Sequence, residues 1–163
     1  MKLFKNAALA AAMTLTWAGM SKAQDLRLLA GWDSSYAAVG EVLMPFIAAI
    51  KDATTADIDI NVMGPETVPP FEQLDPVVRG VFDMLYTNGA YHFNEIASGM
   101  TMDAMNGNTE KLREAGVWGA VDAHYQEIGL KLIAALVDLN GYHIMLKEQA
   151  GDDCLKGRRI RGT

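Results

Sequence analysis

The chain has 163 residues, and its 14 Lys and Arg against 20 Asp and Glu give a formal net charge of −6 at pH 7. Such an acidic chain is a poor candidate for nucleic-acid binding, which depends on Lys and Arg neutralising phosphates. Its one cysteine, Cys154, excludes an internal disulfide framework.

Residues 1–23 have the three parts of a secretory signal. Two lysines precede an apolar run over residues 7–18, and a small-x-small cleavage site ends at Ala23. The apolar run is shorter than the ~20 residues that span a bilayer. We therefore expect cleavage after Ala23 and an exported mature protein beginning at Gln24, whose formal charge is −9 because three lysines and no acids are removed.

The next segments alternate between strand and helix patterns. Residues 26–31 predict a buried first strand that ends at Gly31 and leads into the polar loop 32–36. Apolar residues then recur at three- and four-residue steps over 39–53, which predicts an amphipathic helix. Pro45 should either kink this helix or mark a later start.

A second and a third strand follow. Residues 58–62 alternate apolar with polar side chains, as in a half-exposed strand. A strand-helix-strand order of this spacing predicts a parallel pair with a right-handed crossover. A loop with three prolines over 64–70 leads into a short helix over 71–79, in which Pro76 limits regularity, and then into a strand over 81–87.

The second half predicts two helices and two more strands. Asn108 or Thr109 caps a helix that ends at Glu114, and another spans 117–128. Residues 130–137 predict a fourth strand, and 142–146 a fifth. The fold class is therefore α/β, with a mostly parallel sheet flanked by helices.

The strand-end loops are the candidate binding site, because ligands of open α/β sheets bind at the carboxyl ends of the strands. A carboxylate ligand needs N–H donors, neutral hydroxyl or amide groups and aromatic walls. We expect walls and hydroxyls from the aromatic residues and an amide from Asn88, with core packing as the alternative for each aromatic residue. The residues on this rim are Trp32, Ser34, Ser35, Tyr36, Asn88 and Tyr91.

The C-terminal segment Leu155-Lys-Gly-Arg-Arg-Ile-Arg161 is similar to the L-K-G-x-K-I-R segment of the TRAP-transporter solute-binding proteins, the DctP-like extracytoplasmic receptors for organic acids. The strand entry Gly80-Val-Phe-Asp-Met84, the secretion signal and the order of strands and helices also resemble the family's first lobe. The resemblance spans essentially the whole chain after the signal.

The resemblance implies a periplasmic-binding-protein-like lobe over 24–140 and, over 141–163, a hinge strand and the start of a second lobe that is largely missing. It implies that Arg161 clamps the ligand carboxylate, for which a guanidinium offers two parallel hydrogen bonds. It further implies a periplasmic binding protein rather than an enzyme, and we assign no cofactor and no metal-ligating residue. Its partners would be a small organic acid and the TRAP membrane permease subunits.

Motifs of common enzyme classes are absent from the sequence. There is no Gly-x-Ser-x-Gly, Cys-x-x-Cys, phosphate-binding loop or His-Glu-x-x-His, and the three histidines share no metal-ligand spacing. Two alternatives stay open: a secreted α/β enzyme fragment whose catalytic residues lie in missing sequence, and an inactive truncated product.

Overall fold

The computed structural model describes residues 24–104, 108–135, 146–149, 151 and 154–159. The predicted signal over 1–23, most of the predicted hinge strand and Arg161 lie outside the described residues.

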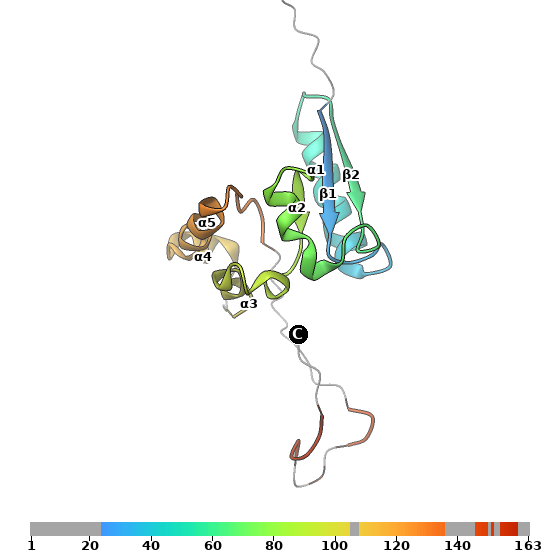
Figure 1. The fold of residues 1–163 in the computed structure, drawn as a ribbon, viewed down its shortest axis with the longest axis vertical. Helices are drawn as coiled ribbons and strands as arrows, with labels where there is room; N and C mark the ends of the chain where they lie inside the picture. Colours follow the sequence, from blue (N-terminus) through green and yellow to red (C-terminus); the bar gives the residue numbers. More distant parts are fainter. Residues whose placement is uncertain (1–23, 105–107, 136–145, 150, 152–153, 160–163) are drawn as a thin grey trace, which may run out of the picture.

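A sheet of three parallel strands is the centre of the fold, with the order β2-β1-β3 (Figure 1). The central strand β1 (Gln24–Ala30) pairs with β2 (Ile58–Met63) on one side and, through its last three residues, with β3 (Met84–Tyr86) on the other. The predicted α/β class and parallel pairing are confirmed. The chain passes from β1 to β2 on one side and then crosses back past β1 to β3 on the other, so the strand order reverses at the carboxyl end of β1, which is a topological switch point.

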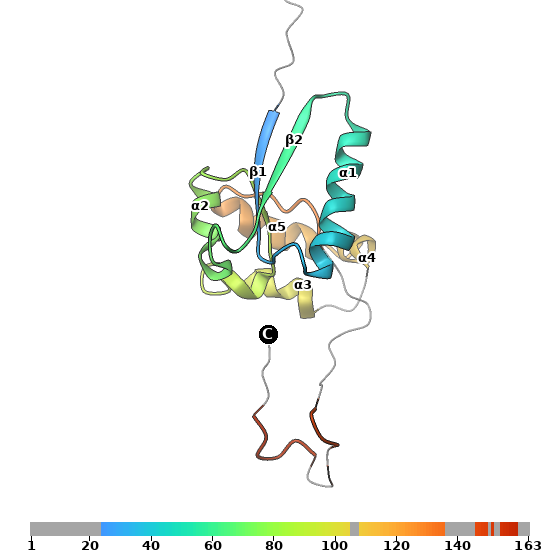
Figure 2. The ribbon, with the colours of Figure 1, turned by 90° about the vertical axis from the view of Figure 1, so that its right-hand side faces the viewer.

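One face of the sheet is covered by a continuous helical segment (Figure 2). It begins as the π-helical η1 (Ala38–Leu43) and continues as α1 (Met44–Ala53). Pro45 lies in the first turn of α1, and the helical backbone of η1 precedes it without a break. Of the two outcomes expected for this proline, the later start holds for the α-helix itself, which begins at Met44. The buried residues of this core are Leu28, Ala30, Val39, Leu43, Ile47 and Ile60.

The opposite face of the sheet is covered by α2 (Leu74–Val78), which follows the 3-10 turn η2 (Pro70–Glu72) (Figure 2). The predicted single helix over 71–79 is thus two short pieces joined at Gln73. The Gln73 side chain is buried, and its Nε2 donates to the carbonyl oxygens of Ala30 and Val68, at 2.9 Å each. These two hydrogen bonds link the proline loop and the start of α2 to the end of β1.

The third strand is shorter than the predicted range 81–87. The backbone N–H groups of Val81 and Phe82, the first two residues of that range, donate to the Pro76 carbonyl, at 2.9 and 3.4 Å. They therefore belong to the end of α2 and not to the strand. The Asp83 carboxylate accepts the backbone N–H of Arg27 at 2.8 Å and pairs with its guanidinium at 3.3 Å. Regular pairing with β1 therefore begins only at Met84.

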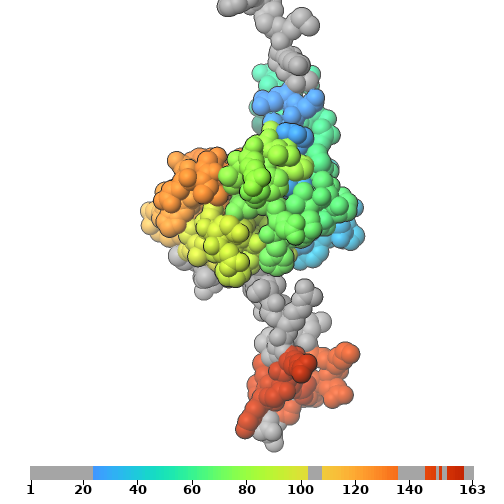
Figure 3. All heavy atoms as spheres, viewed as in Figure 1, coloured from blue at the N-terminus to red at the C-terminus, as the bar shows by residue number. Residues whose placement is uncertain are grey.

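A helical subregion lies beside the sheet, and its last helix, orange in the space-filling view, lies at the left of the molecule next to the light-green segment that contains α2 (Figure 3). Asn108 caps the first longer helix of this subregion, because its side-chain oxygen accepts the N–H of Lys111 at 2.9 Å. The predicted helices over 109–114 and 117–128 are confirmed. The elements are η3 (Gly89–His92), η4 (Ala97–Met100), α3 (Thr101–Ala104), α4 (Thr109–Glu114) and α5 (Val117–Glu127).

The fourth strand predicted over 130–137 is wrong for its described part, since residues 130–135 contain no strand. The N–H of Leu132 donates to Asp122 of α5 at 2.8 Å, and Lys131 donates to the same carboxylate. Hydrogen bonds from Lys131 and Leu132 lower the pKa of this buried carboxyl group. Asp122 therefore holds residues 131 and 132 against α5.

Two glycines make the junction between η3 and η4. Gly89 and Gly99 approach so closely that a Cβ on Gly89 would collide with the Gly99 carbonyl group. A Cβ on Gly99 would in turn lie 2.6 Å from the hydroxyl of Tyr125. This close backbone approach brings η3, η4 and α5 together.

We predict that Gly89→Ala lowers the free energy of unfolding by about 1–3 kcal/mol, because the added methyl group overpacks the junction. Gly119→Ala is the control: no atom lies within 4 Å of a Cβ built there, and alanine favours the helix by about 0.5–1 kcal/mol. Urea unfolding of both variants checks the prediction. Equal stability of the two variants would contradict it.

Candidate functional site

Four aromatic rings form a continuous row at the carboxyl ends of β1 and β3, and we call Tyr36, Trp32, Tyr91 and Phe71 the aromatic row. The Trp32 and Tyr36 rings are stacked, with centroids 5.6 Å apart and planes at 10°. Trp32 and Tyr91 are tilted at 53° with centroids 5.8 Å apart, and Phe71 meets Tyr91 edge-on at 5.0 Å. All three separations lie in the favourable range of about 4.5–7 Å for aromatic pairs.

The backbone at the strand ends explains why these rings meet. The N–H of Gly31 donates to the Tyr86 carbonyl at 2.8 Å and extends the pairing of β1 with β3. A Cβ on Gly31 would lie 3.3 Å from the Tyr91 ring, so the glycine lets that ring approach the strand end. Tyr86 meets Trp32 edge-on at 5.5 Å, and its hydroxyl donates to the Ala38 carbonyl at 3.0 Å. Burial raises the pKa of Tyr86.

The row is open to solvent at both ends. Tyr36 is 53% exposed and Phe71 67% exposed, while Trp32 and Tyr91 are half-buried. The structure thus brings together the three aromatic residues predicted for the site. For Trp32 the core-packing alternative also holds, since one part of its side chain packs against the core beneath the sheet.

Sequence reasoning missed Phe71 and the supporting role of Tyr86. Phe71 directly follows the proline loop that leaves β2, so it also belongs to a strand-end loop. That position could have identified it. Tyr86 is the last residue of β3, but the predicted strand extended one residue further, which obscured its place at the edge.

The polar residues of the rim are satisfied within their own loops. The side-chain oxygen of Asn88 accepts the N–H of Ala90 at 2.7 Å, so Asn88 caps η3. Asp33 accepts the N–H and the hydroxyl of Ser35, at 2.8 and 2.5 Å. These two hydrogen bonds lower the pKa of Asp33. Asn88 therefore has a structural role, and only its NH₂ group remains to donate to a ligand.

Four basic side chains in the described part of the chain form ion pairs with carboxylates outside the aromatic row. These pairs are Arg27 with Asp83, Lys51 with Asp59, Arg79 with Asp75, and Lys131 with Asp122. The cation predicted for the ligand carboxylate, Arg161, lies outside the described residues.

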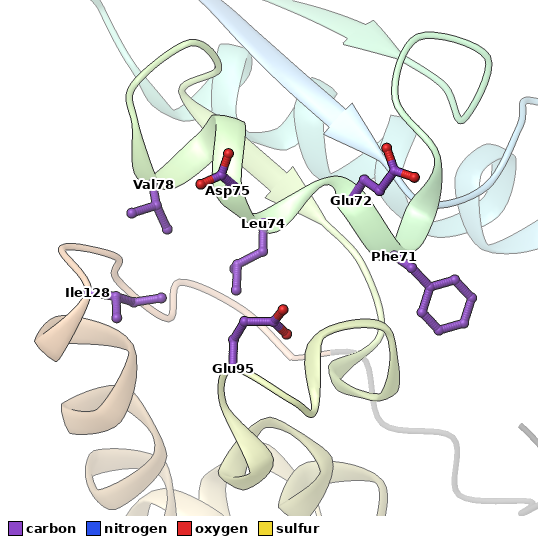
Figure 4. Close-up of a pocket in the computed structure, with 7 residues that line it drawn as sticks. All are labelled: Phe71, Glu72, Leu74, Asp75, Val78, Glu95 and Ile128. Carbon is purple, nitrogen blue, oxygen red and sulfur yellow. The ribbon is translucent and has the colours of Figure 1, made fainter.

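A pocket of about 230 Å³ lies between α2, the segment after η3 and the end of α5 (Figure 4). In Figure 4 the ring of Phe71 points away from the other labelled side chains. Carboxylates next to this pocket repel an organic anion. The pocket is therefore not the predicted anion site. Its lining is acidic and apolar: Phe71, Glu72, Leu74, Asp75, Val78, Glu95 and Ile128.

His92 forms a buried polar contact behind the aromatic row. Its Nε2 lies 2.7 Å from the hydroxyl of Tyr125, and its ring meets the Tyr125 ring edge-on at 5.7 Å. Burial lowers the pKa of His92, against a smaller opposing effect of Glu95. The neutral imidazole therefore joins η3 to α5, next to Tyr91 in the chain.

Two structural findings and one comparison with known proteins complete the description of the site. Among the described residues, no group of three or more His, Cys, Asp or Glu is placed to hold a metal ion. The part of the chain that the structure describes also has no helix both long and apolar enough to cross a membrane. A scan of the sequence against protein-family models finds no match.

We predict that His92 makes the protein less stable at low pH. Because the folded-state pKa of His92 is lowered below its usual 6.5, the unfolded state takes up the proton first as the pH falls. The free energy of unfolding should therefore drop as the pH falls below about 6.5, by at most about 1.4 kcal/mol per pH unit.

Urea unfolding at about pH 7.5 and about pH 5.5 measures this change, and His92→Gln should reduce it. His124→Gln is the matched control, because His124 is exposed on α5. A pH dependence that is the same in the His92→Gln variant and in the unchanged protein would assign the effect to other groups.

Proposed function

We propose that the chain is a periplasmic solute-binding protein of a TRAP-type importer, which binds an organic carboxylate and delivers it to membrane permease subunits. The observation that carries the proposal is the aromatic row at the switch point of a parallel sheet, the edge at which α/β folds bind ligands. The C-terminal segment that resembles the family's arginine motif supports it.

The proposed division of roles follows from the chemistry of the side chains. Arg161 binds the carboxylate through two parallel hydrogen bonds. Trp32, Tyr36 and Tyr91 exclude water from one side of the ligand, and the NH₂ group of Asn88 is available as a neutral donor. In this proposal the described lobe is one wall of a cleft, and a second lobe closes over it about a hinge.

Intrinsic fluorescence tests the proposed site directly, because the chain has three tryptophans: Trp17, Trp32 and Trp118. Trp17 lies in the predicted signal, so in a Trp118→Phe background Trp32 is the only tryptophan of the mature protein. Titration with a panel of organic acids should then change the emission saturably, and a version with Trp32→Phe and Trp118 retained is the control. Unchanged Trp32 emission together with unchanged melting temperature for every acid would reject the proposal.

We predict that Arg161→Ala weakens carboxylate binding on the order of 100-fold or more, because two charged hydrogen bonds are lost. Arg161→Lys should lose less, since lysine keeps the charge but not the planar fork. Arg158→Ala, three residues earlier in the same basic segment, is the control with a small effect. Isothermal titration calorimetry measures all three, and unchanged affinity in Arg161→Ala would remove this residue from the site.

A further inference from the structure

We infer that the pocket between α2 and the end of α5 binds a small organic cation, namely a primary ammonium group on a short alkyl chain. The site is separate from the aromatic row and does not rest on the proposed function. Phe71 belongs to both, but its ring points away from the other side chains of the pocket (Figure 4). The inference follows from the size, the apolar surface and the charge of the pocket.

The size of the pocket restricts the ligand to a small molecule. Its volume of about 230 Å³ lies below the range of about 300–1,000 Å³ that is usual for drug-sized ligands. A short chain with one charged end fits such a volume better than a ligand with several rings.

Apolar side chains provide the inner surface of the pocket. Leu74 and Val78 lie one turn apart on α2, and Ile128 follows α5. The three side chains point toward one another in Figure 4. Val78 is 41% exposed, so a ligand can cover apolar surface that water now contacts. Each methylene group buried there should tighten binding by about 4-fold.

The charge of the lining selects a cation. The lining contains three carboxylates and no Lys, Arg or His. The carboxylate of Glu95 extends toward Leu74 (Figure 4). Asp75 pairs with Arg79 at 3.0 Å, whereas Glu72 and Glu95 form no ion pair within the described part of the chain. Glu95 is therefore placed to accept the ammonium group of a ligand whose chain lies on the apolar surface.

Other classes of ligand fit this pocket less well. Carboxylates repel an anion, and a neutral apolar ligand would take water from Glu95 without giving it a partner. A metal ion needs several ligand atoms that converge on one point. Among the described residues no group of three or more His, Cys, Asp or Glu is so placed. An alkylammonium ion meets both the charge and the apolar surface.

Methyl NMR of the exported protein, titrated with four probes, tests the inference. n-Pentylammonium should shift the methyl signals of Leu74, Val78 and Ile128 saturably and bind most tightly. Methylammonium keeps the charge without the chain and should bind at least about 10-fold more weakly. 1-Pentanol keeps the chain without the charge and should bind about 2- to 5-fold more weakly, the usual contribution of an exposed ion pair. Pentanoate should leave the signals unchanged.

Variants of the lining locate the two parts of the ligand. Glu95→Gln should weaken pentylammonium by about 2- to 5-fold and leave pentanol binding unchanged. Val78→Thr, which keeps the shape but adds a hydroxyl group, should weaken both probes. Both side chains are exposed, so neither substitution alters the buried core. Glu41→Gln is the matched control, because Glu41 is exposed on η1, on the opposite face of the sheet from α2.

The outcomes decide the inference without reference to carboxylate binding. Tighter binding of pentylammonium than of pentanol, reduced in Glu95→Gln and unchanged in Glu41→Gln, supports the cation site. Equal binding of the two probes, or an equal pentylammonium affinity in Glu95→Gln and the unchanged protein, overturns it. So do shifts of the three methyl signals with pentanoate, or no shifts with any probe. The proposed function is tested separately, through Trp32 and Arg161.

Discussion

The position of β1 between two parallel partners is the constraint on which the rest of the structure depends. β2 and β3 lie on opposite sides of it, so the connection from β2 to β3 crosses past β1, and loops that follow the strands gather at its carboxyl end. Hydrogen bonds fix that end further: Gly31 donates to Tyr86, and Gln73 donates to Ala30. The aromatic row is built on this fixed edge, so its geometry is set by sheet pairing and not by the loops alone.

The regular elements of the sheet could be predicted because their causes are local. The apolar run of β1, the alternation of β2 and the three- and four-residue steps before α1 each contain their own signal. Pro45 illustrates the limit of such signals. It indicated a kink or a later start, but the π-helical turn that precedes α1 is shaped by packing of Val39 and Leu43 under the sheet.

The errors arise where a distant side chain takes over a backbone group. Residues 130–135 have a strand-like pattern, but Asp122, ten residues before Leu132, accepts the N–H that a strand would need. Phe71 lies in η2, within the predicted helix range, and its ring completes the row across loops that are distant in sequence. Periodicity contains neither of these contacts. Asn88 is a local case, because its oxygen caps the turn that follows it and its NH₂ group is left for the proposed ligand.

The hydrogen bonds that Asp122 accepts from Lys131 and Leu132 also connect this part of the chain to the aromatic row. The chain beyond Leu132 is tethered to α5 by that carboxylate, and α5 holds η3 through the contact of Tyr125 with His92. Tyr91, the neighbour of His92, contributes its ring to the row. The chain after Leu132 is therefore connected to the aromatic row through one helix and two hydrogen bonds in series.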